Sequence, residues 1–153
     1  KKQGKTVGIV ESCTGGNIGR HFTNVPGASD YFMGSLVTYS YAAKQAVVNV
    51  KAETLKDFGA VSEETVKEMA VGGKQALQSD YCVATSGIAG PDGGTDDKPV
   101  GTVWIAVATP EHVVAKKFQF GTHRQRNITM SSLAALNFLR IELLKAENDE
   151  RFQ

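Results

Sequence analysis

The chain of 153 residues is long enough to bury the core of one domain, and its 41% hydrophobic and 22% charged residues are ordinary for a globular protein. A formal net charge of +1 gives no electrostatic reason to expect a nucleic-acid or membrane partner, and no segment approaches the ~20 apolar residues of a membrane span. Two cysteines, Cys13 and Cys82, are too few for a disulfide framework and favour a reducing, cytoplasmic setting. The histidines lack metal-ligand spacing, which argues against a zinc site.

The first third of the chain alternates strand and helix patterns. Residues 6–10 form a short β-branched run that is typical of a buried strand. A helix capped by Ser12 or Thr14 is expected from about residue 15 to 23. The aromatic and β-branched stretch 31–40 predicts a second strand.

Three helices are expected next. The first covers residues 41–50, with Ala42, Ala46 and Val50 on one side. The second covers 51–58 and ends at Gly59, the residue type expected just past a helix end. The third begins after the cap residue Ser62 and runs to about residue 78.

The rest of the chain predicts a strand at 80–87, a hairpin of strands at 100–109 and 112–120, and a long closing helix at 125–145. We find no linker or internal repeat, so residues 1–153 are expected to form a single domain. This order of elements predicts an α/β fold: a three-layer α/β/α domain with a mixed, mostly parallel five-stranded sheet.

Three segments that follow strands carry small and hydroxyl residues. They are "ESCTGG" at 11–16, "TYSYAAK" at 38–44 and the glycine-rich stretch at 85–101. Ligands of open α/β sheets bind outside the carboxyl ends of parallel strands, so these segments are expected to meet at one sheet edge.

The turn at 11–16 allows three interpretations. Main-chain N–H groups at the helix start, of Thr14, Gly15 and Gly16, could hold a phosphate or an oxyanion. Ser12 or Cys13 could be a nucleophile, or the turn could simply cap a helix. The hexapeptide alone does not decide among these interpretations.

The second segment supplies Tyr39 and Lys44. Either side chain could move a proton, but Lys44 would act as a base only if burial lowers its pKa. A lone lysine on an alanine-rich helix is more often exposed.

The glycine-rich stretch includes Gly87 and Gly90 and predicts a ligand loop, because ordering such a loop costs entropy that a plain connection rarely justifies. It matches neither the P-loop nor the dinucleotide-binding pattern. Its aspartates, between residues 92 and 97, suggest either magnesium or a solvated turn. Arg124 and Arg126 open the last helix, and Arg124 is the better candidate for binding a phosphate or carboxylate.

These motifs, in order, resemble a known family. "ESCTGG", "PGASDYFMGSLVTYSYAAK", "GAVSEETVKEMA", "TSGIAGPDGGTDDKPVGTVWIAV" and "FGTHRQRNIT" are similar to the C-terminal domain of CinA, also found alone as nicotinamide mononucleotide deamidase. The resemblance covers about residues 11–144. The family's usual first helix, upstream of the first strand, is largely absent here.

The resemblance implies an amidohydrolase that converts nicotinamide mononucleotide to nicotinic acid mononucleotide and ammonia without metal or cofactor. It implies Ser12 as nucleophile, with Tyr39 and Lys44 activating it or relaying protons. It also implies that Ser29, Ser86 and Arg124 contact the substrate. The residues argued from the helix start and the glycine-rich loop complete the candidate binding set: Thr14, Gly15, Gly87 and Gly90. Tyr41 and His123 depart from the family's usual asparagine and acidic residue.

Two function classes follow. The first is this deamidase, with a small-molecule substrate, no nucleic-acid or membrane partner, and a homodimeric state. The second is a catalytically idle nucleotide-binding or regulatory module linked to competence and DNA damage, because a fold does not guarantee activity. Release of ammonia from the nucleotide distinguishes the two.

Overall fold

The computed structural model describes residues 1–151, and the side chains of residues 1–148. The strands are β1 (Val7–Glu11), β2 (Phe32–Val37), β3 (Tyr81–Gly87), β4 (Thr102–Ala108) and β5 (Val113–Gln119). The helices are α1 (Asn17–Thr23), α2 (Tyr41–Val48), α3 (Ala52–Phe58), α4 (Glu63–Ala76) and α5 (Arg124–Arg151), with a short 3-10 turn η1 (Ala28–Asp30). The predicted order of strands and helices is confirmed, with bounds that differ by a few residues.

The five strands form one sheet in the order β2-β1-β3-β4-β5. β1 pairs in parallel with β2 and β3, whereas β4 is antiparallel to both β3 and β5. Every strand except β4 therefore runs in the same direction. The expected mixed, mostly parallel sheet is confirmed.

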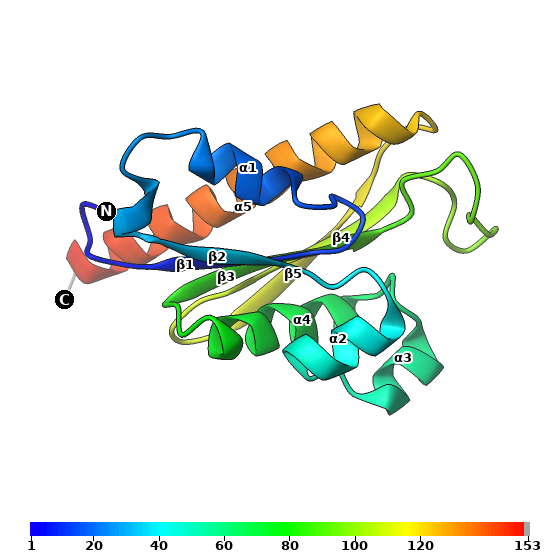
Figure 1. Cartoon of the computed structure of the whole chain (residues 1–153), viewed down its shortest axis with the longest axis horizontal. Helices are drawn as coiled ribbons and strands as arrows, with labels where there is room; N and C mark the ends of the chain where they lie inside the picture. The colour runs from blue at the N-terminus through cyan, green and yellow to red at the C-terminus, as the bar shows by residue number, and fades with distance from the viewer. Residues whose placement is uncertain (152–153) are drawn as a thin grey trace.

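Helices cover both faces of the sheet, which makes the three expected layers (Figure 1). α1 and α5 lie on one face, and α2, α3 and α4 lie on the other. Each face has its own apolar core because strand side chains alternate: Ile9 and Val83 belong to the α1/α5 cluster, whereas Val10 and Ala84 belong to the α4 cluster. None of the described helices is long and apolar enough to cross a membrane.

Two glycines in α4 let this helix approach its neighbours closely. A Cβ on Gly72 would lie 1.8 Å from the carbonyl oxygen of Val48, and one on Gly73 would lie 2.1 Å from the Val10 side chain. Any larger residue would push α2 or β1 away. These contacts fix α2 against the rest of the fold.

The packed side of α2 differs from the pattern in the sequence. Ala42 and Ala46 are exposed, and the buried residues of the helix are Lys44 and Val48. The expected packed side was wrong because alanine side chains are small enough to lie on either side of a helix. Lys44 can be buried because it has the polar partners described below.

Candidate active site

Ser12 and Lys44 meet at the carboxyl edge of the sheet. Ser12 follows β1, and Lys44 lies in α2, which begins shortly after β2. Because these strands are adjacent and parallel, both segments reach the same edge. Lys44 Nζ donates a hydrogen bond to Ser12 Oγ at 3.0 Å. The pair is therefore within direct proton-transfer distance.

Lys44 is fully buried and has two further acceptors. Its Nζ also donates to the main-chain oxygens of Thr38 at 2.8 Å and Tyr39 at 3.1 Å. No ion pair joins it to a carboxylate among the described residues. Burial lowers the pKa of Lys44 to about 8, because the charged form loses hydration without gaining a counter-charge. About a tenth of the amine is then neutral at pH 7.

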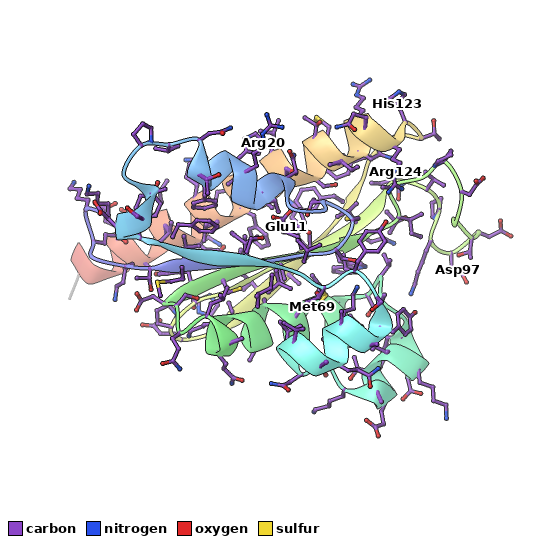
Figure 2. All side chains as sticks on the ribbon, viewed as in Figure 1. Glu11, Arg20, Met69, Asp97, His123 and Arg124 are labelled. Carbon is purple, nitrogen blue, oxygen red and sulfur yellow. The ribbon has the colours of Figure 1, made fainter. Side chains whose placement is uncertain are left out.

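Glu11, the residue before Ser12, fills the start of α1. Its buried carboxylate accepts hydrogen bonds from the N–H groups of Gly16 at 3.0 Å, Ile18 at 3.0 Å and Gly19 at 2.8 Å. It also accepts from the hydroxyl of Ser35 at 2.9 Å. Figure 2 shows Glu11 between α1 and the sheet. The helix start is thus occupied by the protein's own anion, which argues against a phosphate cradle there.

The cap expected from Ser12 or Thr14 is absent. α1 begins at Asn17, and its N-cap Gly16 makes no side-chain hydrogen bond. Gly15 donates its N–H to the carbonyl oxygen of Ser12 at 3.1 Å, so this amide is already used inside the turn. Within residues 1–151, the N–H of Thr14 has no acceptor, while its hydroxyl lies 2.9 Å from that of Thr85. Thr14 therefore offers a free amide at the turn.

The Cys13 side chain is buried in the apolar core and not at this polar edge. Its side chain belongs to the apolar cluster under α1 and α5. Burial raises the pKa of the thiol to about 12, which keeps it protonated at neutral pH. Of the two candidate nucleophiles, Ser12 is the one whose side chain hydrogen-bonds to the amine of Lys44 among the described residues.

Tyr39 and Arg124 extend the site toward the glycine-rich loop. Arg124 Nη1 donates to the carbonyl oxygen of Gly90 at 2.8 Å, and its Nη2 donates to the hydroxyl of Tyr39 at 3.3 Å. Figure 2 shows Arg124 beside the base of this loop, with Asp97 near the tip. The Tyr39 side chain is 59% exposed, so the Tyr39–Arg124 pair lies at the solvent side of the site.

Ser86 and Gly87 are placed in the strand rather than in the loop. The buried Ser86 hydroxyl donates to the carbonyl oxygen of Ala60 at 2.7 Å and ties β3 to the segment before α4. A Cβ on Gly87 would lie 2.6 Å from Val103 Cγ2, so this glycine is needed for strand packing. Both positions shape the base of the loop.

Ser29 lies away from the other candidate residues. It is an exposed residue of η1, which precedes β2, whereas the site follows β2. The strand separates the two by about 20 Å. Within one chain the structure does not bring Ser29 to Ser12.

The described residues contain no group of three or more His, Cys, Asp or Glu side chains that could hold a metal ion. The loop aspartates are exposed, as in a solvated turn.

A sequence profile of the CinA C-terminal domain matches residues 1–143. The chain belongs to the CinA C-terminal domain family. A CinA-like protein of Cytophaga hutchinsonii is 50% identical over 143 residues, which cover 94% of this chain and 34% of that protein. One of Fervidobacterium nodosum is 46% identical over 146 residues, 95% of this chain and 36% of that protein. The chain thus spans about a third of the length of these curated relatives.

Solved structures of the same family share the fold. The competence damage-inducible protein A of Klebsiella pneumoniae is 34% identical with a TM-score of 0.90, covering 94% of this chain and 89% of that one. A competence/damage inducible protein of Agrobacterium tumefaciens is 36% identical with a TM-score of 0.89, covering 92% and 86%.

Sequence reasoning missed several polar residues of this CinA domain. The role of Glu11 is one of them, and the available signal was a carboxylate at the end of a buried apolar run, just before a glycine turn. Asn127 is buried in α5 and donates to the carbonyl oxygens of Ala89 at 2.9 Å and Gly121 at 2.8 Å. It supports the glycine-rich loop one helical turn after Arg124, and no motif in the sequence indicates this role.

Proposed function

We propose that this CinA domain hydrolyses the carboxamide of nicotinamide mononucleotide, giving nicotinic acid mononucleotide and ammonia. The observation that carries the proposal is the hydrogen bond between Lys44 Nζ and Ser12 Oγ, made by a lysine whose pKa burial lowers to about 8. The substrate comes from the family resemblance, and the family membership supports it.

The geometry around Lys44 favours a base role. In the neutral amine, two N–H bonds can point to the carbonyl oxygens of Thr38 and Tyr39, which leaves the lone pair directed at the Ser12 hydroxyl. Lys44 would take the Ser12 proton as Oγ attacks the carboxamide carbon. No histidine is needed for this step.

Lys44, Ser12 and the main chain of the turn can also carry out the remaining steps. The oxyanion forms near the free N–H of Thr14, which can donate to it. Lys44 then returns its proton to the leaving nitrogen, so that ammonia departs and an ester to Ser12 remains. Water, deprotonated by Lys44, hydrolyses the ester to the carboxylate and frees Ser12.

Tyr39 and Arg124 would bind the substrate in this account. The Tyr39 hydroxyl has Arg124 as its hydrogen-bond partner, and the contact between Tyr39 and Lys44 goes through the Tyr39 main chain. We therefore assign proton transfer to Lys44 directly. The guanidinium of Arg124 can exchange its present acceptors for the substrate phosphate.

Ammonia release from nicotinamide mononucleotide by the purified chain tests the proposal, with calorimetric binding of the same nucleotide as a parallel measurement. The deamidase releases ammonia, and Lys44→Met abolishes the release. Lys74→Met, which removes a half-buried lysine that donates to the carbonyl oxygen of Thr109, is the matched control and keeps the activity. Nucleotide binding without ammonia release would favour the idle nucleotide-binding module.

A further inference from the structure

Ser12 is bonded to β3 as well as to Lys44. Its main-chain N–H donates to the carbonyl oxygen of Thr85 at 3.1 Å. The next residue of β3, Ser86, is buried, and its hydroxyl donates to the carbonyl oxygen of Ala60 at 2.7 Å. Ser12 and the main chain of Ala60 are therefore held by adjacent residues of one strand.

The main chain of Ala60 is also bonded to the first residue of α2. Its N–H donates to the hydroxyl of Tyr41 at 3.2 Å. Tyr41 lies three residues before Lys44, so both belong to the first turn of the helix. Since Lys44 Nζ donates to Ser12 Oγ, the contacts form a closed ring that runs from Ser12 through β3, Ala60 and α2 and back to Ser12.

The segment that contains Ala60 is fixed independently of α2. The carbonyl oxygen of Gly59 accepts hydrogen bonds from the hydroxyls of Ser62 at 3.0 Å and Thr65 at 2.7 Å, which lie at the start of α4. With the contact to β3, these bonds attach Ala60 to the sheet and to α4. The hydroxyl of Tyr41 therefore joins α2 to a segment that is already held in place.

The other contacts of α2 fix the helix elsewhere. Ser40 caps it by accepting the N–H of Ala43 at 3.1 Å, but this bond lies within one segment of the chain. Val48, at the far end of α2, is fixed by its close approach to Gly72 of α4. The Tyr41 hydroxyl adds a second point of attachment, in the turn that carries the lysine.

We propose that Tyr41 is a positioning residue whose hydroxyl, through the N–H of Ala60, fixes the first turn of α2. The Lys44 amine is thereby kept within hydrogen-bond distance of Ser12. The inference rests on the proposed function, because the position of Lys44 affects turnover only if this amine is the base.

Tyr41→Phe removes the hydroxyl and keeps the ring. Because the Tyr41 side chain is 50% exposed, the variant is expected to fold. Loss of one ordinary hydrogen bond lowers the population of α2 in the productive position by up to about fivefold. We expect kcat for ammonia release to fall about three- to fivefold while KM for nicotinamide mononucleotide changes less than about twofold.

Tyr31→Phe is the matched control. It removes a tyrosine hydroxyl from the residue before β2, at the opposite edge of the sheet, and is expected to keep both kinetic constants. Unchanged kcat in Tyr41→Phe overturns the proposal, whether KM is unchanged or raised. A raised KM at native kcat would place Tyr41 on the substrate instead.

Titration of Lys44 without substrate separates this proposal from the proposed function. The side-chain NMR signal of Lys44, identified by its loss in Lys44→Met, reports a pKa that is about 8 in the native chain. In Tyr41→Phe we expect this pKa to rise by about 0.5 or more, because water reaches the amine when α2 moves, and to stay unchanged in Tyr31→Phe. An unchanged pKa in Tyr41→Phe overturns the positioning role. A raised pKa in a chain that releases no ammonia would support that role and refute the deamidase alone.

Discussion

The amine of Lys44 lies 3.0 Å from the hydroxyl of Ser12, although 32 residues of chain separate them. The parallel pairing of β1 and β2 brings the two segments together, and the close approach of α4 to α2 keeps the lysine buried. Burial gives Lys44 the lowered pKa that a base near neutral pH requires.

The rate of deamidation should rise with pH. The reactive form of Lys44 is the neutral amine, and its fraction grows as the pH passes about 8. We expect kcat/KM to increase about tenfold from pH 7 to pH 9 and then level off. A pH–rate profile that is flat over this range would remove Lys44 as the base.

Lys44→Arg should be inactive even though it keeps a cation at the site. A guanidinium stays protonated in proteins and cannot accept the Ser12 proton, so we expect a loss of about 10²- to 10⁴-fold in kcat. Steady-state ammonia release measures this. A variant that retains half of the native rate would mean that position 44 supplies only positive charge.

Burial of Lys44 also predicts a pH dependence of stability. Its pKa is about 8 in the folded chain and about 10.5 when unfolded, so between these values the unfolded state binds one proton more. The free energy of unfolding should therefore rise with pH by up to about 1.4 kcal/mol per unit in this window, and the gain is lost as the pH falls to 8. Urea unfolding at two pH values, compared with Lys44→Met, isolates the effect. Equal slopes in both proteins would contradict it.

Glu11→Gln should destabilise the fold and loosen the Ser12 turn. The amide nitrogen cannot accept the hydrogen bonds that a carboxylate oxygen now receives from α1, and a buried donor would face other donors. We expect a loss of about 2–4 kcal/mol in the free energy of unfolding, measured by denaturant titration. Glu53→Gln, in the first turn of α3, is the control and should change it by less than about 0.5 kcal/mol. A Glu11 variant as stable as this control would show that the cap is dispensable.

Arg124→Ala should raise KM for nicotinamide mononucleotide about tenfold. If Arg124 binds the phosphate, nicotinamide riboside, which lacks it, should be processed equally by the native and variant enzymes. Arg126→Ala, at an exposed position, serves as the control. A kcat loss of the same size for both substrates would instead place Arg124 on the reacting group.

Much of the fold could be predicted from the sequence because its strands are short and β-branched and its helix ends carry strong signals. Ser62 caps α4 by accepting the N–H of Thr65, and Gly59 follows α3, both as expected. The start of α1 could not be predicted, because its cap is the side chain of Glu11 five residues upstream of Gly16. Such a contact depends on the turn's conformation rather than on a local pattern.

The sequence indicated which residues form the candidate site, but it did not indicate how they are buried or which contacts they make. The sequence suggested Ser12 and Lys44, but burial of Lys44 depends on the packing of α2 against α4, which an alanine-rich helix does not reveal. Ser29 belongs to a motif of the family resemblance, but it precedes β2, whereas the site follows this strand. The order of motifs along the chain does not show which edge of the sheet each loop occupies.

The central claim is that Ser12 is the nucleophile, and a pair of variants tests it most directly. Ammonia release from nicotinamide mononucleotide should fall to background in Ser12→Ala, while Cys13→Ala keeps near-native turnover because its buried thiol stays protonated. Binding of the nucleotide, measured separately, should survive in Ser12→Ala. Near-native turnover in Ser12→Ala, or a folded but inactive Cys13→Ala, would contradict the account.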